Sequence, residues 1–211
     1  MTAPAPRLVL HRHPLSGHAH RVELLLSLLG LAAERIDVDL AAGAHRRPEF
    51  VAKNPFGQIP VLQDGDIVIA DSNAILVYLA RRYDAAGTWY PADAETAAEI
   101  QRWLSVAAGP LAAGPNRARL IVRFGAEGDL DAARATAHGL FGVLDRHLAT
   151  RRFLVGRAAT IADLALYSYT AHAPEGGVAL APYPGIEAWL SRVEALPGFV
   201  PMPASPAERA A

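Results

Sequence analysis

The 211-residue sequence contains no cysteine, which excludes disulfide bonds, thiolate metal ligands and any reaction that uses a thiol of the protein itself. It also lacks excess charge, since 20 Lys and Arg face 21 Asp and Glu for a net charge of -1. Because the basic residues form no long run, nucleic acid and anionic membranes are poor partners. There is no basic-then-apolar leader and no apolar stretch long enough to cross a bilayer. We therefore expect a soluble, cytoplasmic protein.

The sequence is rich in apolar residues, at 52% of the chain, which is enough to fill sizeable cores. Up to residue 84 it alternates patterns typical of strands and helices. Strands are indicated over residues 8–10, 36–40, 61–62 and 67–69, and helices over residues 22–29, 48–52 and 72–83. This β-α-β-α-β-β-α order predicts a small mixed sheet with helices on both faces, in which the first two strands are parallel and the last two antiparallel.

Residues 84–93 lose this periodicity and contain Gly87 and Pro91, as is typical of a linker. Beyond them every pattern is helical. The sequence predicts a long amphipathic helix over residues 130–148, a helix that starts at a capping box over residues 160–163, and a last helix over residues 186–195. We therefore expect an α/β domain over residues 1–84, a linker over residues 85–93 and an all-α domain over residues 94–211.

The stretch from Asn54 to Leu62 prescribes an unusual backbone. Pro55 and Pro60 donate no backbone hydrogen bonds and disfavour helix in the residues before them, while Gly57 supplies the permissive dihedral angles of a turn. Asp64-Gly65 predicts a hairpin, which makes Pro60 the entry residue of a strand. The backbone before that strand is then free to bind an extended peptide.

Several short segments together resemble the glutathione-binding half of a glutathione transferase, with the phi type and some bacterial relatives as the closest class. These segments are His45 to Glu49, Asn54 to Pro60, Asp64 to Asp66, and Asp71-Ser72. Phe153 to Gly156 and Thr160 to Asp163 are similar to the family's helical C-terminal domain. The resemblance covers essentially the whole chain. It implies a thioredoxin-like α/β N-terminal domain plus an all-α C-terminal domain, with glutathione as co-substrate.

Ser16 stands just before the first predicted helix, where the residues alone leave two roles open. It can be an N-cap that accepts a hydrogen bond from an orphan helix amide. Its hydroxyl can also donate to a thiolate, an anion that the positive end of the helix dipole already favours. The matching serine of serine-type glutathione transferases has this second role, so the resemblance implies that Ser16 is catalytic. His18 can border the same thiol, and Arg21 matches an arginine that we interpret as structural.

The resemblance further implies that glutathione lies along a cis Ile59-Pro60 bond, where the Ile59 backbone pairs with the cysteinyl residue. Asp71 then opposes the γ-glutamyl ammonium, at a position where the family more often has Glu. Ser72 opens a helix, where a ligand carboxylate meets free amides and a hydroxyl. A simple N-cap is the alternative role for Ser72. Gln58 adds an amide contact at this end of the ligand.

At the other end, His45 and Arg46 correspond to a phi-type His-Lys pair that holds the glycyl carboxylate. Arg in place of Lys keeps the charge and adds a fork of donors. For an isolated surface pair, exposure to solvent is the more common role, and only the surrounding motif favours ligand binding. Lys53 is a weaker candidate for the same carboxylate.

His11, His13, His18 and His20 form a cluster that could suggest a metal. The first pair shares one side of a strand, but the second pair diverges on a helix. No nearby carboxylates or cysteines complete a coordination set. We therefore expect no metal site.

The acceptor substrate is expected to bind in an apolar cleft between the second half and the first. The candidates for its lining, besides His18, are Trp103, Val106, Asn116 and Arg119, for each of which core packing is the alternative. Two prolines and Gly114 predict a kink or break in the helical segment there. Phe56 is a candidate key residue of a homodimer, with packing inside its own subunit as the alternative.

The function implied is that of a glutathione transferase, in which the glutathione thiolate attacks an electrophilic, mostly apolar small molecule in detoxification. Two alternatives stay open from the sequence. The first keeps glutathione but changes the reaction to peroxide reduction, disulfide exchange or isomerisation. The second is a non-catalytic glutathione-binding or interaction module with the same fold.

Overall fold

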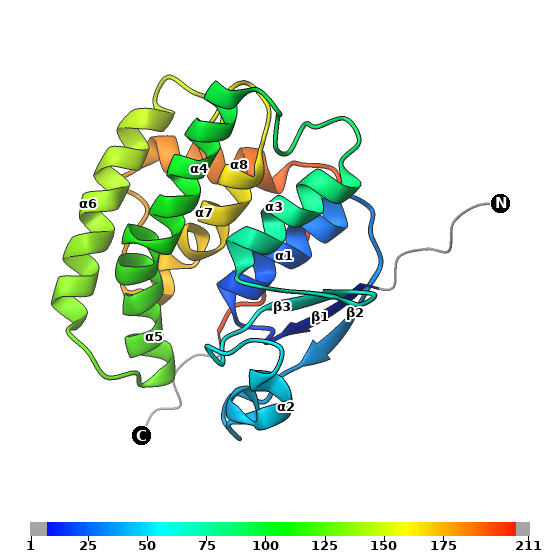
Figure 1. Ribbon diagram of the computed structural model, residues 1–211. Coiled ribbons are helices and arrows are strands. Elements are labelled where there is room, and N and C mark those ends of the chain that lie inside the picture. The colour runs from blue at the N-terminus through cyan, green and yellow to red at the C-terminus, as the bar shows by residue number, and fades with distance from the viewer. Residues whose placement is uncertain (1–7, 206–211) are drawn as a thin grey trace.

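The computed structural model describes residues 8–205, so the ends of both expected domains lie outside the described residues (Figure 1). Four strands form one sheet in the order β2-β1-β3-β4. Their bounds are Leu8–Arg12 for β1, Ala33–Asp37 for β2, Val61–Asp64 for β3 and Ile67–Ala70 for β4. The strand β1 runs parallel to β2 and antiparallel to β3, which in turn pairs antiparallel with β4. The predicted strand directions are confirmed, with the first two strands parallel and the last two antiparallel.

Two details of the sheet differ from the prediction. The second strand was expected over residues 36–40, but β2 ends at Asp37 because its register is set by pairing with β1, from Leu8 opposite Ala33 to Arg12 opposite Asp37. As an edge strand it is mostly exposed, so apolar alternation is a poor guide to its bounds. The hairpin loop is Gly65-Asp66, since Asp64 pairs with Ile67.

Helices cover both faces of the sheet, as predicted (Figure 1). The helices α1 (Gly17–Leu28) and α3 (Ser72–Tyr83) lie on one face, where their leucines pack on Leu10 and Leu62. On the other face, α2 (Pro48–Val51) buries Phe50 against Val61 and Val38. A 3-10 turn over Ala44–Arg46 precedes α2. Gly30 follows α1 with a left-handed φ of 66°, as expected of a helix stop.

The second half is helical throughout. Its helices are α4 (Ala94–Ala108), α5 (Arg117–Phe124), α6 (Leu130–Leu148), α7 (Ile161–Ala171) and α8 (Pro184–Glu194), with a 3-10 turn over Ala173–Gly176. The predicted break is confirmed as a π-helical segment over Ala112–Asn116 that contains Pro115. Gly114 lies so close to α6 that an added Cβ would be 2.8 Å from the Ala137 amide nitrogen. Glycine is therefore required at this helix crossing.

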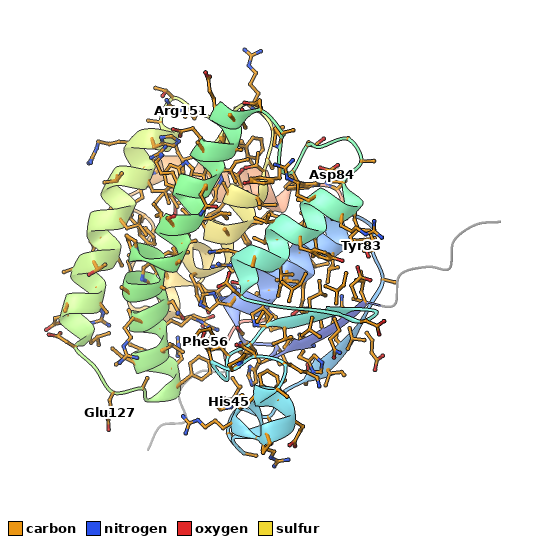
Figure 2. The ribbon with its side chains drawn as sticks, in the orientation of Figure 1. His45, Phe56, Tyr83, Asp84, Glu127 and Arg151 are labelled. Carbon is orange, nitrogen blue, oxygen red and sulfur yellow. The ribbon has the colours of Figure 1, made fainter. Side chains whose placement is uncertain are left out.

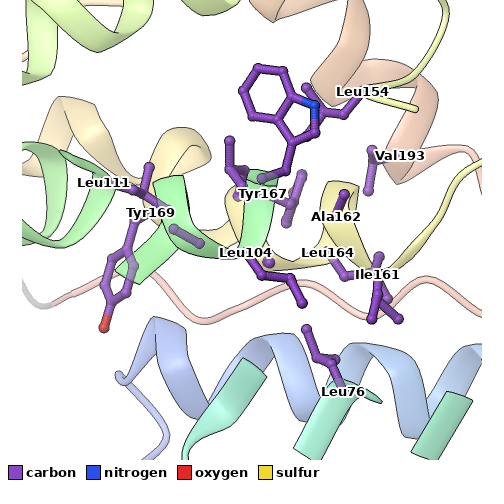
Figure 3. Close-up of a cluster of buried hydrophobic side chains, with 14 of the residues drawn as sticks. Leu76, Leu104, Leu111, Leu154, Ile161, Ala162, Leu164, Tyr167, Tyr169 and Val193 are labelled. Carbon is purple, nitrogen blue, oxygen red and sulfur yellow. The ribbon is translucent and has the colours of Figure 1, made fainter. Parts of the chain in front are cut away.

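Helix α7 is the centre of the second half, and all its residues from 161 to 170 are buried. The predicted capping box is confirmed at its start, where Asp163 accepts from the Thr160 amide. Asp163 also accepts from the Leu154 amide and the Trp189 indole, each at 2.9 Å. Figure 3 shows α7 side chains meeting Leu104 of α4 and Leu76 of α3. One apolar core thus joins the two halves.

No helix between residues 8 and 205 has the length and apolarity that a membrane crossing requires.

Candidate functional site

A cavity of about 1060 Å³ lies where the two halves meet. The first half lines it with residues from four loops, at 13–18, 40–45, 54–60 and 70–72, and the second half with residues from 116–124 and with Tyr169. Figure 2 shows His45 and Phe56 on neighbouring loops below the sheet. The glutathione-binding loops predicted from the sequence therefore converge on one cavity.

The loop from Asn54 to Gln58 is held by the buried Asn54 side chain. Its amide nitrogen donates to the Gln58 carbonyl at 2.7 Å, and its carbonyl accepts from the Phe56 amide at 3.1 Å. Gly57 has a φ of 59° and lies against the neighbouring loop, since an added Cβ would be 3.0 Å from the His45 carbonyl oxygen. Glycine is needed for both reasons, and its presence brings these two cavity-lining loops into contact.

The bond between Ile59 and Pro60 is cis, as the resemblance implied. Within residues 8–205, the backbone amide and carbonyl of Ile59 have no hydrogen-bond partner. Both residues line the cavity. The edge that was expected to be free to pair with a peptide is therefore present and faces the cavity.

Asp71 has a φ of 73°, the one positive value of a non-glycine residue between residues 8 and 205. Such a backbone costs about 1–3 kcal/mol and persists where the surroundings impose it, often at a ligand site. Its carboxylate accepts from the Asn73 and Ala74 amides, each at 2.9 Å, and so caps α3. The N-cap alternative considered for Ser72 is therefore wrong, because Ser72 is the first helical residue and Asp71 is the cap.

Behind Ser72, a buried arginine joins α1 to the start of α3. Arg21 is fully buried and donates to the Ser72 hydroxyl at 3.3 Å and to the Asn73 side-chain carbonyl at 2.8 Å. Burial lowers the pKa of Arg21 to about 10, so the side chain is charged at neutral pH. Its contacts are those of the structural residue expected at this position.

Ser16 is the N-cap of α1 and lines the cavity, so both roles considered for it are compatible. Its hydroxyl oxygen accepts from the Ala19 amide at 3.3 Å. A hydroxyl has one proton besides its two acceptor lone pairs. The Ser16 proton is therefore free to be donated to a ligand while the oxygen caps the helix.

His18 lies beside Ser16 in the cavity lining, with its Nδ1 3.3 Å from the Ser72 hydroxyl. Burial, and next to it the charge of Arg21, lower the pKa of His18 to about 3. The ring is therefore neutral at physiological pH. It can shape the thiol site, but it supplies no positive charge to a thiolate.

The comparisons with known proteins agree with this geometry. Family models match both halves, "Glutathione S-transferase, N-terminal domain" over residues 6–81 and "Glutathione S-transferase, C-terminal domain" over residues 97–197. The chain is 36% identical over 219 residues to glutathione S-transferase 3 of Zea mays, covering 96% of this chain and 99% of the relative. The chain belongs to the glutathione S-transferase family. Full-length relatives of this name and both family models make it a glutathione transferase.

Solved structures of the family share the whole fold. A glutathione S-transferase from Pseudomonas fluorescens is 32% identical with a TM-score of 0.88, covering 92% of this chain and 98% of that one. A glutathione transferase homologue from Drosophila mojavensis, solved with bound glutathione, is 27% identical with a TM-score of 0.83, covering 91% and 89%. The family thus includes proteins of the same architecture that hold glutathione.

The transferase cavity unites only part of the predicted carboxylate site. His45 lines the cavity, and its Nδ1 is buried without a partner among the described residues. Gln58, predicted for the γ-glutamyl end, lines the cavity as well. Arg46 is exposed and lies outside the lining. Lys53 lines a separate hollow of about 290 Å³ near His11, with its ammonium 3.4 Å from the Glu49 carbonyl.

The acceptor-site candidates also separate into two groups. Asn116 and Arg119 line the cavity together with His18, whereas Trp103 and Val106 do not. Trp103 is 2% exposed and packs on His147 of α6 at a ring distance of 4.8 Å. The acceptor interpretation of Trp103 and Val106 is therefore wrong, because their positions on α4 turn them into the helical core.

Several lining residues were missed by sequence reasoning, namely Leu15, Leu120, Phe124 and Tyr169. Phe124 ends α5 and is 45% exposed. Tyr169 belongs to the fully buried run of α7, which the sequence presents as core. A buried tyrosine hydroxyl normally finds a polar partner, and this requirement is the signal that could have distinguished it.

The histidine cluster disperses in the fold of the transferase. His11 bonds to the Gln63 side chain, His13 accepts from the Leu15 amide, and His20 lies between Ser168 and the Val200 carbonyl. Across residues 8–205, no three histidine or acidic side chains gather as a metal site would require.

Proposed function

We propose that glutathione binds along the Ile59-Pro60 edge and that the Ser16 hydroxyl stabilises its thiolate for attack on an electrophilic carbon. One observation supports this most directly: the Ser16 hydroxyl and the Ile59 backbone, which has no hydrogen-bond partner within residues 8–205, line the same cavity. An extended peptide that pairs with Ile59 has its side chains fixed by the pairing. The N-terminus of α1 adds a positive potential at the thiolate.

The ends of the tripeptide are assigned by charge. Asp71 carries the negative charge that suits the γ-glutamyl ammonium, while Ser72 and the first amides of α3 suit the γ-glutamyl carboxylate, with Gln58 beside them. At the opposite loop, the unpartnered His45 Nδ1 suits the glycyl carboxylate. Arg46 can join it only by turning from solvent toward the ligand.

The second substrate is proposed to be apolar. Leu15, Leu120 and Phe124 supply apolar lining. Arg119 offers no free cation, because its guanidinium donates to the Glu175 carboxylate at 2.7 Å, the Leu15 carbonyl at 2.8 Å and the Ser205 hydroxyl at 2.7 Å. An uncharged electrophile therefore fits this wall better than an anion does.

We also propose a detoxifying role, a cytoplasmic location, a metal-free reaction and a homodimer. Reduced glutathione is kept available in the cytosol, where thiols stay reduced. Phe56 is 84% exposed at the cavity rim, which suits insertion into a second copy of the chain. The boundaries of the two domains, with a linker over residues 85–93, belong to the same proposal.

Calorimetric titration with glutathione and its S-alkyl conjugates tests binding, and the absorbance of the bound thiolate against pH tests Ser16. We expect Ser16→Ala to keep binding within a few-fold while the pKa of the bound thiol rises and turnover of an aryl halide falls. Ser105→Ala, on the exposed face of α4, is the matched control. Absence of binding at millimolar glutathione refutes the proposed site, and an unchanged thiol pKa refutes the role of Ser16. Parallel turnover of a hydroperoxide and a mixed disulfide distinguishes transfer from peroxidase and reductase chemistry.

A further inference from the structure

Asn116 is a buried polar residue on the wall that the second half contributes to the cavity. It is 8% exposed and ends the π-helical segment before α5. Its Oδ1 is buried without a hydrogen-bond partner among the described residues. Its Nδ2 has no partner within residues 8–205 either, but this atom is accessible. The amide nitrogen is therefore the end of the side chain that opens to the cavity.

The polarity of this side chain has a cost that the fold does not explain. A buried acceptor without a donor gives up its hydrogen bonds to water and gains none in return. Leucine has the same branched shape and would pack here without that loss. The packing of the helix therefore does not require an amide at position 116. The polar group points instead to a role toward what enters the cavity.

The helical segment that carries Asn116 is held firmly on two other sides. Gly114 packs on α6, where an added Cβ would be 2.8 Å from the Ala137 amide nitrogen. Gly176 of the 3-10 turn packs on α5, where an added Cβ would be 2.7 Å from the Arg119 amide nitrogen. Because both contacts are so close, the segment has little room to turn. The amide is thus held at the cavity wall before a ligand binds, as a preorganised donor should be.

The position of Asn116 brings it toward the thiol site. It has helical dihedral angles, so Arg119 and Leu120, three and four residues later, share its face of the helix. On that face Arg119 donates to the Leu15 carbonyl at 2.8 Å, next to Ser16. All of these residues line the cavity. Since the Arg119 guanidinium is committed to other partners, Asn116 supplies the unused donor of this face.

We propose that Asn116 determines acceptor specificity by donating from Nδ2 to an oxygen of the second substrate that takes up negative charge. The class that fits is an uncharged conjugated carbonyl compound. The thiolate sulfur forms a bond to the β-carbon, the double bond shifts to the carbonyl carbon, and the charge moves to the carbonyl oxygen as an enolate. Water then supplies a proton to the α-carbon, and no group leaves. The inference rests on the proposed function, because the attacking thiolate is that of glutathione.

A donor at this place favours one kind of electrophile over another. The carbonyl oxygen gains its charge only during attack, so the hydrogen bond from Asn116 strengthens in the transition state. A benzyl halide instead passes the charge to the departing halide, on the side of the carbon opposite the sulfur. The amide therefore accelerates addition to an enone and has little effect on displacement of a halide.

Asn116→Leu removes the donor and keeps the branched shape. The measurement is kcat/KM for a conjugated enone and for a benzyl halide at saturating glutathione. We expect the enone value to fall about ten- to hundredfold, as the loss of one hydrogen bond to a charged oxygen predicts, and the halide value to stay within twofold. Asn116→Ala, which removes the donor without adding volume, should show the same selective loss. An unchanged enone value, an equal loss with both substrates, or a wild type that uses only the halide overturns the proposal.

Two control variants separate the donor from the shape of the wall. Leu120→Ala alters the apolar lining on the same face and should lower both values alike. Tyr169→Phe removes another neutral hydroxyl of the cavity lining and should keep the ratio of the two values. A ratio that changes in Tyr169→Phe and not in Asn116→Leu transfers the donor role to Tyr169 and overturns the assignment.

The ratio of the two values also separates this inference from the role of Ser16. Both reactions use the same thiolate, so the ratio does not depend on how that thiolate is stabilised. An unchanged thiol pKa in Ser16→Ala refutes the role of Ser16 and leaves the comparison for Asn116 intact. Absence of glutathione binding refutes both.

Thermal unfolding distinguishes a role of Asn116 in binding from a role in folding. Asn116→Leu removes the buried Oδ1 that has no partner, so we expect Tm to be unchanged or higher. A lower Tm together with an equal loss of both rates assigns Asn116 to the fold and contradicts the proposal.

Binding of reaction products tests the same hydrogen bond without a variant. The wild type should bind the glutathione conjugate of the enone about threefold more tightly than the same conjugate with a methylene in place of the carbonyl. Equal Kd values for the two conjugates in calorimetric titration overturn the proposal.

Discussion

His20 provides a quantitative test of the structure, because it is buried and both of its ring nitrogens have hydrogen-bond partners. Nε2 lies 2.9 Å from the Val200 carbonyl oxygen, which can only accept, so Nε2 carries the proton. Nδ1 lies 2.8 Å from the Ser168 hydroxyl, which can donate to a neutral ring or accept from a protonated one. The imidazole joins α1 to α7 and to the chain segment after α8.

Burial lowers the pKa of His20 from 6.5 to about 4, opposed by the bond to Val200 and assisted by the nearby His172 and Arg21. A pKa that is lower in the folded state means that acid favours the unfolded chain. The stabilising contribution is complete above pH 6.5 and is lost as the pH falls through about 4. Between pH 7 and 4.5 the free energy of unfolding should fall by about 2 kcal/mol from this residue alone.

Urea unfolding at a series of pH values measures this contribution. His20→Gln keeps an amide donor for Val200 but has no proton to gain, so it should lose this part of the pH dependence, although it is less stable at pH 7. Ser168→Ala leaves the imidazole buried and should retain the dependence, since burial is the main cause. A wild type and a His20→Gln protein with the same slope of unfolding free energy between pH 6 and 4.5 would refute the reasoning.

Two further predictions concern the carboxylates. Asp71→Asn keeps an oxygen that caps α3 but removes the charge proposed to bind the ligand ammonium. The KM for glutathione should therefore rise about tenfold, equivalent to about 1.4 kcal/mol, with little change in thermal stability. The control variant Asp66→Asn, in the exposed hairpin loop, should leave the KM unchanged. Burial raises the pKa of Glu175, but hydrogen bonds from Ser205, His172 and Arg119 outweigh it and lower that pKa to about 2. The stabilisation that Glu175 contributes is complete above pH 4.5 and is lost as the pH falls through 2. Between pH 7 and 3 the free energy of unfolding of the Glu175→Gln variant should therefore fall by about 2 kcal/mol less than that of the wild type. Acid unfolding curves of the two proteins that coincide would contradict this.

Local patterns were sufficient wherever neighbouring residues determine the backbone. The hairpin and the capping box at Thr160 both follow from residues close in sequence. The break over residues 112–116 does too, because proline and glycine interrupt a helix regardless of its neighbours. The cis Ile59-Pro60 bond does not, since it was expected only from the resemblance to the family and most X-Pro bonds are trans. The bounds of β2 could not be predicted from local patterns, since an edge strand takes its register from the strand beside it.

Side-chain direction within the helical half could not be predicted in this way. Trp103 and Tyr169 are both aromatic residues on helices of the second half, and both are almost fully buried. Helix α7 is buried on every side, so it has no polar face from which to infer which residue reaches the cavity. Only the packing of the helices on one another decides that Tyr169 of α7 meets the start of α1 and that Trp103 of α4 meets His147 of α6.

The position of Ser16 depends on both halves of the chain. The first half provides the helix terminus that Ser16 caps, but the second half holds the preceding residue, because Arg119 of α5 donates to the Leu15 carbonyl at 2.8 Å. Arg119 is itself fixed by Glu175, and Tyr169 packs on the residue that follows Ser16. The loop that carries the serine is thus clamped from both sides by α5 and α7. A thiolate-stabilising hydroxyl must be held within a few tenths of an ångström, and such a clamp provides that rigidity. Under the proposed function, the helical half therefore contributes to thiol activation as well as to the choice of acceptor.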